Sequence, residues 1–385
     1  MKWINFLHLY QPVNADPAII KEAAEKSYYR IVSALEKSPR TKFTINITGC
    51  LLMRLDELGY GDLIKRINKL VKKGQIELVG SAAYHALLPL MPVAEIKKQI
   101  RENELFLEKY FGRYKMRGFF LPEMAYNSEA AKIIKSFGYQ WIMLSEIAYN
   151  GKLNSVDFNK VYQDKTSNLK VIFRSRAFSK CYVPSCLLEK IKNDKNGLYI
   201  TATDGELYGL RHIDHGKELE KLLKRKKLQT TTISEFIGRK EIEKKIIPRP
   251  CSWESTEEEM SKNNPYALWH DKKNKIQQDI WQLARLAYNI VEGNKKDKNY
   301  HFSRWHLVRG LASCTFWWAS AKDFRLFSPI SWSPDEIERG VNELVRAVRT
   351  LDSEKTRAIK IKAEKIHIRI KHDIWTKHWA EYWKK

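Results

Sequence analysis

Leu198-Tyr199-Ile200-Thr201-Ala202-Thr203 is a run of strand-forming residues that leads directly into Asp204-Gly205-Glu206-Leu207-Tyr208-Gly209. A second acidic residue is placed in the same way, because Glu123 ends the apolar run Gly118-Phe119-Phe120-Leu121-Pro122. The last side chains of barrel strands open onto the loop-lined mouth, so carboxylates from two strands can face one substrate from opposite sides. We therefore expect Glu123 and Asp204 to share one mouth, where such a pair is suited to breaking a glycosidic bond.

Strand-like and helical runs alternate over residues 1 to about 215. This βα alternation predicts a parallel sheet, and with about seven strands we expect the sheet to close into a barrel. Helices are predicted over 15–37, 51–73, 93–111 and 128–137, with Gly74 ending the second of them. The predicted strands are 3–8, 42–47, 76–80, the run before Glu123, 141–144, 169–174 and 198–203.

The pattern changes near residue 250. Apolar residues recur at three- and four-residue spacing over 274–291, 301–321 and 334–351, which predicts helices. In the last stretch, 354–385, apolar residues first alternate as in a strand and later recur at the spacing of a helix face. We favour a helix. We expect two domains: a barrel over 1–250 and a helical region over 251–385 that packs on it.

The charge balance is strongly basic, with 69 Lys and Arg against 45 Asp and Glu and a net charge of +24. Nucleic acid is therefore a partner to consider. The positive charge is concentrated in 221–227, 239–245, 295–298 and 355–371, which read as exposed helix or loop, so solvated faces are the favoured explanation. A nucleic-acid partner is not expected.

Five scattered cysteines form no Cys-x-x-Cys pair, which argues against a disulfide framework and a zinc knuckle. No apolar run approaches the roughly 18 residues of a membrane span, and no leader-like opening is present. We expect a soluble protein of a reducing cytoplasm. The sequence does not indicate an oligomeric state.

Four ordered segments resemble the motifs of glycoside hydrolase family 57. His8-Leu9-Tyr10-Gln11-Pro12 is similar to the first motif, although Tyr10 stands where many relatives have a second histidine. The other three are 79–90, which contains His85, then Phe119-Phe120-Leu121-Pro122-Glu123, then Asp204-Gly205-Glu206-Leu207-Tyr208-Gly209. The resemblance spans residues 8–209, and the helical region that follows in the family extends through at least Ala321.

The resemblance implies a (β/α)7 barrel, an incomplete TIM-like barrel, with a helical C-terminal region. It also implies retaining action on α-linked sugars without a metal or other cofactor, as in α-amylases, 4-α-glucanotransferases and branching enzymes. Glu123 would attack the anomeric carbon and Asp204 would protonate the leaving oxygen. The residues that the resemblance places around the substrate are His8, Tyr10, Gln11, His85, Glu206 and Tyr208.

The helical region offers further substrate contacts. Trp269 and His270 follow a loop-like segment, and Trp317 lies where the fifth motif of the family is expected. That match is poor, because the Asp of the family's Ser-Asp-Trp is missing from 313–318. For each tryptophan, packing and sugar stacking remain equally open.

Double displacement requires two carboxyl groups about 5–5.5 Å apart, one ionised to attack and one protonated to donate. Like charges raise the pKa of one acid of a close pair. Our hypothesis is that Asp204 keeps its proton before the first step because Glu123 is negative.

Several alternatives stay open. His212-Ile213-Asp214-His215 suggests a metal site of the kind that polysaccharide deacetylases use, but no second compatibly spaced ligand pair is apparent. The barrel could instead bind carbohydrate with weak or no turnover. Finally, the basic, Trp-rich tail from Lys360 to Lys385 could bind polyanions.

Overall fold

The computed structural model describes residues 1–193, 197–321 and 332–382. The chain divides into two compact units. The first comprises Met1–Ala83 and Leu88–Trp253, and the second comprises Tyr84–Leu87 and Glu254–Lys385. The second unit thus takes in a four-residue segment from within the predicted barrel region.

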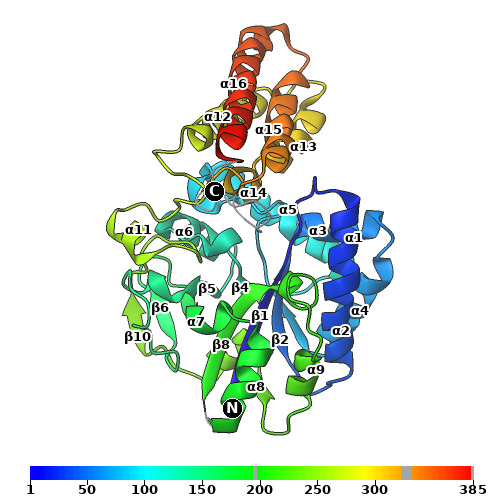
Figure 1. The fold of residues 1–385 in the computed structure, drawn as a ribbon, viewed down its shortest axis with the longest axis vertical. Helices are drawn as coiled ribbons and strands as arrows, with labels where there is room; N and C mark the ends of the chain where they lie inside the picture. Colours follow the sequence, from blue (N-terminus) through cyan, green and yellow to red (C-terminus); the bar gives the residue numbers. More distant parts are fainter. Residues whose placement is uncertain (194–196, 322–331, 383–385) are drawn as a thin grey trace. The chain divides into compact units, whose positions relative to one another are not determined.

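The first unit is built on two sheets, and β1 lies inside one of them, between β2 and β8 (Figure 1). One sheet has the order β3-β2-β1-β8, with β9 also pairing with β1, and the other has the order β10-β6-β7-β5-β4. Every pair except β6–β7 is parallel. The strands are β1 (Lys2–Leu9), β2 (Phe43–Ile47), β3 (Ile76–Leu78), β4 (Gly118–Phe119), β5 (Trp141–Ser145), β6 (Tyr162–Asp164), β7 (Lys170–Arg174), β8 (Leu198–Asp204), β9 (Gln229–Thr230) and β10 (Lys244–Ile246).

Two short seams join these sheets into a ring. Beyond β3, the amide of Gly80 donates to the carbonyl of Gly118 at 3.0 Å, and that of Phe120 donates to Gly80 at 2.8 Å. Beyond β7, the amide of Ser175 donates to the carbonyl of Ile200 in β8 at 2.9 Å. The ring β1-β2-β3-β4-β5-β7-β8 is the predicted seven-stranded parallel barrel, and β6, β9 and β10 are additions that the sequence did not suggest.

Successive side chains of each strand point alternately to the inside of the barrel and to the surrounding helices. Ile4 and Phe6 of β1 belong to one buried cluster together with residues of β8 such as Ala202. Trp3 and Leu7 belong to a separate cluster with helical residues. The inner cluster therefore shares the parity of His8 and Asp204, which end these two strands.

The four helices predicted in the first unit are present, two of them are interrupted, and α7 to α10 were not predicted. The region predicted as one helix over 15–37 contains a π-helical turn, η1 (Ala24–Tyr28). The region over 51–73 is two helices, because Gly59 between them has a φ of +87°. A short helix follows β7. The α-helices are α1 (Pro17–Ala23), α2 (Tyr29–Glu36), α3 (Gly49–Glu57), α4 (Gly61–Lys72), α5 (Val93–Phe111), α6 (Ser128–Ser136), α7 (Arg176–Ser179), α8 (Val183–Asn193), α9 (Glu218–Leu223) and α10 (Ile233–Gly238).

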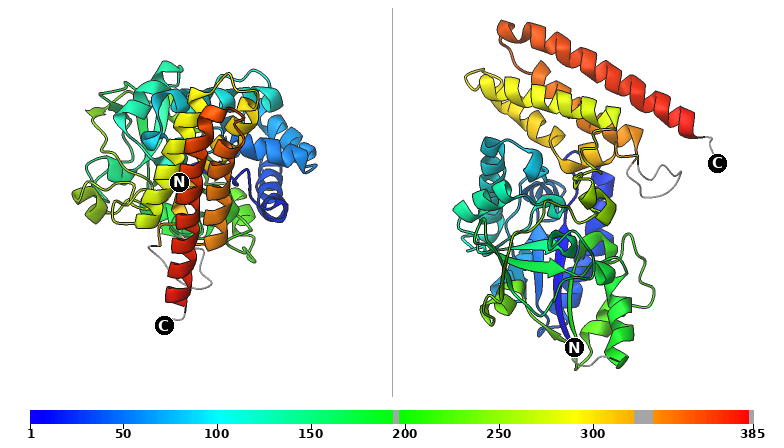
Figure 2. Two further views of the ribbon diagram at one scale, coloured as in Figure 1. Left: turned by 90° about the horizontal axis from the view of Figure 1, so that it is seen from above. Right: turned by 90° about the vertical axis from the view of Figure 1, so that its left-hand side faces the viewer.

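The second unit is helical, as predicted. Its long helices α12, α15 and α16 run side by side in both views of Figure 2 and contact one another. The predicted helix over 301–321 is two helices, and the ambiguous C-terminal stretch is a helix. The bounds are α11 (Glu257–Ser261), α12 (Lys275–Gly293), α13 (Tyr300–Gly310), α14 (Ser313–Trp317), α15 (Pro334–Arg349) and α16 (Arg357–Tyr382).

Two of the five cysteines are bonded to each other. Cys181 and Cys186 form a disulfide, although the cysteine pattern had argued against disulfide bonding, and Cys50 and Cys251 are buried thiols. Within the described ranges, no helix combines the length and apolar character that crossing a membrane requires.

Candidate functional site

Asp204 ends β8 beside the end of β1, where it is paired in register with His8. Its side chain is 23% exposed and lies on the inner face of the barrel, by the parity described above. Arg211, from the loop that follows β8, places Nη1 2.8 Å from Oδ2 of Asp204. The carboxylate at the end of β8 is therefore ion-paired in this structure.

Glu206 lies two residues beyond Asp204, in the short 3-10 helix η5 (Gly205–Leu207), and is buried. Its Oε1 accepts hydrogen bonds from the phenol of Tyr28 and, at 3.2 Å, from Nε2 of Gln11. Burial, together with the nearby charge of Asp204, raises the pKa of Glu206 to about 7. The carboxyl with the clearly raised pKa is thus Glu206, whereas the sequence hypothesis assigned the retained proton to Asp204.

The π-helical turn η1 supplies two of the contacts to this loop. Ser27 donates to the carbonyl of Gly205 at 2.7 Å, and Tyr28 donates to Glu206. The loop also contacts this turn closely at Gly209, which has a φ of +123°. A Cβ at this position would lie 2.3 Å from the carbonyl oxygen of Lys26. π-Helical turns are rare in proteins overall, but those that occur are often found at functional sites. This turn fixes the backbone of the segment that carries Glu206.

His8 is buried at the end of β1, with its Nδ1 2.8 Å from Oδ1 of Asn46. Its ring stacks on that of Tyr10, with centroids 5.7 Å apart, and lies 4.6 Å from the ring of Phe120. Burial lowers the pKa of His8 to about 4, against the opposing effect of Asp204, so the imidazole is neutral at pH 7. A neutral imidazole at this position can exchange hydrogen bonds with sugar hydroxyls without adding charge.

Glu123 lies in the 3-10 turn η3 (Pro122–Met124) that follows β4, and it has a left-handed backbone with φ 60° and ψ 16°. Met124 is also left-handed, with φ 46°. A residue other than glycine costs about 1–2 kcal/mol in this conformation, and such strain clusters at functional sites. The amide of Trp253 donates to the Glu123 carbonyl at 2.9 Å and helps to hold the turn.

Arg174, the last residue of β7, bridges β8 and Trp253, and the sequence analysis did not identify this link. Its Nη1 donates to the carbonyl of Ala202 in β8, and its Nη2 donates to the carbonyl of Trp253, both at 2.9 Å. Since Trp253 also holds the turn of Glu123, these contacts link the backbones near both acids. The signal available in the sequence was an arginine at the end of a predicted strand.

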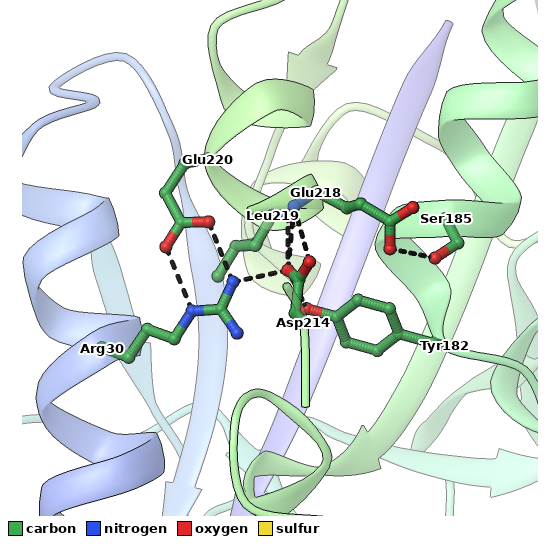
Figure 3. Close-up of polar contacts among 7 residues, drawn as sticks. All are labelled: Arg30, Tyr182, Ser185, Asp214, Glu218, Leu219 and Glu220. Carbon is green, nitrogen blue, oxygen red and sulfur yellow. Dashed lines mark hydrogen bonds and ion pairs between the residues drawn. The ribbon is translucent and has the colours of Figure 1, made fainter. Parts of the chain in front are cut away.

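A second polar cluster lies beyond Arg211 along the same loop (Figure 3). Asp214 has no exposed side-chain surface and accepts from Arg30 of α2, from the phenol of Tyr182, and from backbone amides at the start of α9. These donors lower the pKa of Asp214 to about 2. Within the His212-Ile213-Asp214-His215 motif, Asp214 therefore caps the start of α9 and anchors the loop to α2. Over the described ranges, no group of three or more His, Cys, Asp or Glu side chains is arranged to hold a metal ion.

The remaining predicted residues differ in placement. Tyr208 is 1% exposed and belongs to the core cluster outside the barrel, which favours packing over substrate contact. His85 belongs to the second unit, where its Nδ1 lies 2.9 Å from the Ser313 hydroxyl. Trp269 of that unit is 1% exposed.

The other two predicted residues of the second unit are less buried. His270 is half-buried, and burial with nearby positive charges lowers its pKa. Trp317 is partly exposed and packs edge-on against Trp318, with ring centroids 4.6 Å apart. The sugar-binding roles of these residues remain predictions.

Comparison with known proteins gives a family match over most of the chain. The model of glycosyl hydrolase family 57 matches residues 3–250. An α-amylase of Pyrococcus horikoshii is 32% identical over 149 residues, which are 38% of this chain and 23% of that protein. A 4-α-glucanotransferase of Thermococcus litoralis is 26% identical over 149 residues, 38% of this chain and 22% of that protein. The matched region thus spans about a quarter of the length of these relatives.

Solved structures show the same fold. The 4-α-glucanotransferase of Thermococcus litoralis superposes with a TM-score of 0.73 at 16% identity, covering 92% of this chain and 60% of that one. A branching enzyme of Pyrococcus horikoshii superposes with a TM-score of 0.69 at 17% identity, covering 97% of this chain and 95% of that one.

Proposed function

Because the chain belongs to glycosyl hydrolase family 57, we propose that it is a retaining glycoside hydrolase or transglycosylase that acts on α-linked glucan or a related oligosaccharide. Glu123 is the nucleophile and Asp204 is the acid/base. The observation that carries this proposal is that both residues follow parallel strands of one seven-stranded barrel, within the region that the family model matches.

The surroundings of the two acids support these roles. The strained turn at Glu123 holds a charged side chain where glycine would cost less, which is expected where function fixes the residue. Around Asp204, the neutral His8, the buried Glu206 and the ion-paired Arg211 provide polar groups that act on the carboxyl. His8, Tyr10 and Gln11 are the proposed sugar contacts of the first unit. In the second unit, His270 and Trp317 remain the proposed contacts, whereas His85 and Trp269 are each 1% exposed, which favours packing as it does for Tyr208.

Hydrolysis and transfer share the covalent glycosyl-enzyme and differ in whether water or a sugar hydroxyl takes the sugar from Glu123. The curated relatives include both an α-amylase and a 4-α-glucanotransferase, so we propose the shared chemistry without choosing its acceptor. A cytoplasmic location is part of the proposal and rests on the three cysteines that are free thiols, whereas the disulfide of Cys181 and Cys186 is of a kind that is rare in the cytosol.

Incubation with maltoheptaose, followed by chromatography of the products, tests the function. Shorter fragments alone would indicate hydrolysis, and chains longer than the substrate would indicate transfer. Glu123→Gln and Asp204→Asn should each lower the rate by on the order of 10²-fold or more. An unchanged substrate would contradict α-glucan turnover, and near-full activity in either variant would contradict its assigned role.

A further inference from the structure

The ion pair between Arg211 and Asp204 bears on how the acid obtains its proton. A carboxyl that donates a proton to a leaving oxygen must first be protonated, whereas a guanidinium at 2.8 Å stabilises its ionised form. We propose that Arg211 is a positioning residue that holds Asp204 ionised in the unloaded protein, and that bound substrate displaces its guanidinium so that Asp204 takes up the proton it donates. This inference rests on the proposed function.

The loop allows the side chain of Arg211 to move while its backbone stays fixed. The amide of Arg211 donates to the carbonyl of Glu206 at 2.8 Å, and Gly209 is pressed against the π-helical turn. The side chain of Arg211 is nonetheless 54% exposed, against 23% for Asp204. Ion pairs of such exposure contribute little to stability, so a ligand that occupies the mouth can displace the guanidinium at small cost.

The groups around Asp204 explain why displacement favours proton uptake. Asp204 interacts electrostatically with His8 on β1, with Glu206 in η5 and with Arg211 on the loop, and Tyr28 of η1 lies behind Glu206. His8 is neutral at pH 7, so Arg211 is the positive charge that acts on both carboxyls. Once it leaves, Asp204 and Glu206, which interact electrostatically, lack this cation, and the pair retains a proton more strongly.

Asp204 takes a proton from water as the guanidinium leaves. Glu123 uses a carboxylate electron pair to form a bond to the anomeric carbon, while the pair of the breaking glycosidic bond goes to the leaving oxygen, which receives the proton of Asp204. Water or a sugar hydroxyl returns a proton to Asp204 when it attacks the glycosyl-enzyme.

The test compares pH profiles of wild type, Arg211→Gln and Arg211→Lys on maltoheptaose. The profile of kcat/KM reports the free enzyme, and that of kcat reports the substrate complex. In wild type, the basic limb of kcat/KM should fall at lower pH than that of kcat. In R211Q, the basic limb of kcat/KM should move to higher pH by roughly one unit, with the kcat limb unchanged, and R211K should restore most of the gap.

Arg225→Gln is the matched control, because it removes one positive charge from an exposed site elsewhere on the same unit. It should leave both limbs in place. Identical kcat/KM limbs in wild type and R211Q, or a shift of the same size in R225Q, would overturn the proposal.

A second measurement does not depend on turnover. The side-chain carboxyl carbons of the free protein can be titrated by NMR in wild type and R211Q, with D204N to assign the signal of Asp204. That signal should titrate at higher pH in R211Q. An unchanged titration midpoint would contradict this proposal, even if the enzyme is active. A shifted midpoint in a protein that does not act on maltoheptaose would support this proposal and contradict only the proposed substrate.

Discussion

The guanidinium of Arg174 lies over the indole of Trp253, 5.1 Å from the ring centroid, and donates to the carbonyl of the same residue. Through its other nitrogen it holds the carbonyl of Ala202, two residues before Asp204. One side chain thus joins the strand that ends at the proposed acid to the residue that supports the turn of the proposed nucleophile.

We expect Arg174→Ala to destabilise the protein by about 2–4 kcal/mol, because it leaves buried carbonyls without donors and removes ring packing. Arg174→Lys should recover only part of this loss, since an ammonium cannot reproduce the planar, two-armed contact. Urea denaturation measures the stability, and activity should fall in both variants under conditions where they remain folded. Wild-type stability in R174K would show that the two-armed contact is unimportant.

The backbone at Glu123 predicts a trade-off between stability and activity. Glu123→Gly should raise the free energy of unfolding, by up to about 1 kcal/mol, because glycine adopts φ 60° without strain. It should also abolish activity. Glu123→Gln is the control, since it removes the charge but keeps the strained backbone, and it should be inactive without the gain. Equal unfolding midpoints for the two variants would argue against strain at this turn.

Glu206 predicts a pH dependence of stability. Its pKa in the folded protein is about 7, above the ordinary value of 4.5, so the folded state binds more protons than the unfolded state between these values. The contribution of this group to stability is therefore most favourable below about pH 4.5 and declines as pH rises through 7.

Glu206→Gln should remove that decline, because the amide carbonyl can still accept from Tyr28 without acquiring charge. Thermal unfolding between pH 4.5 and 8 measures the difference between wild type and variant. Glu241→Gln, at an exposed position, is the control and should parallel wild type. A constant difference between wild type and E206Q across this range would contradict the raised pKa.

Gly209 predicts that the loop after β8 tolerates no side chain at its contact with η1. Gly209→Ala should cost more stability than Gly59→Ala, because both have positive φ but only position 209 would bring a Cβ against a backbone carbonyl. We expect about 1 kcal/mol for G59A and at least twice that for G209A. G209A should also lower activity by displacing Arg211 and Glu206, whereas G59A should not.

The barrel was predictable because each of its strands can be recognised from a short stretch of sequence. Each of the seven strands is a short apolar run followed by a polar loop, and the alternation with helices fixes a parallel arrangement. The breaks in the helices were harder to predict, because Gly59 ends α3 by adopting a positive φ within a sequence whose apolar periodicity continues across it. β10 was harder to predict because it pairs with β6 over three residues only, too few to show a clear alternation.

The acids were predictable from their positions at strand ends, but their neighbours were not. Arg174 and Trp253 act through backbone carbonyls, which no sequence motif records. Tyr28 reaches Glu206 across 178 residues of sequence. The pKa of Glu206 depends on burial that only the folded chain creates, so composition could not indicate which carboxyl keeps a proton.

The π-helical turn at Ala24–Tyr28 contains one residue more than an α-helical turn would need. Deleting a single residue there, such as the exposed Glu25, would let a regular α-helix run through this point, so that the residues of the turn would change direction while the flanking helix keeps its face. Ser27 and Tyr28 would then lose their alignment with Gly205 and Glu206. A one-codon change in a surface helix could therefore alter the protonation chemistry of this site without substituting any residue within it.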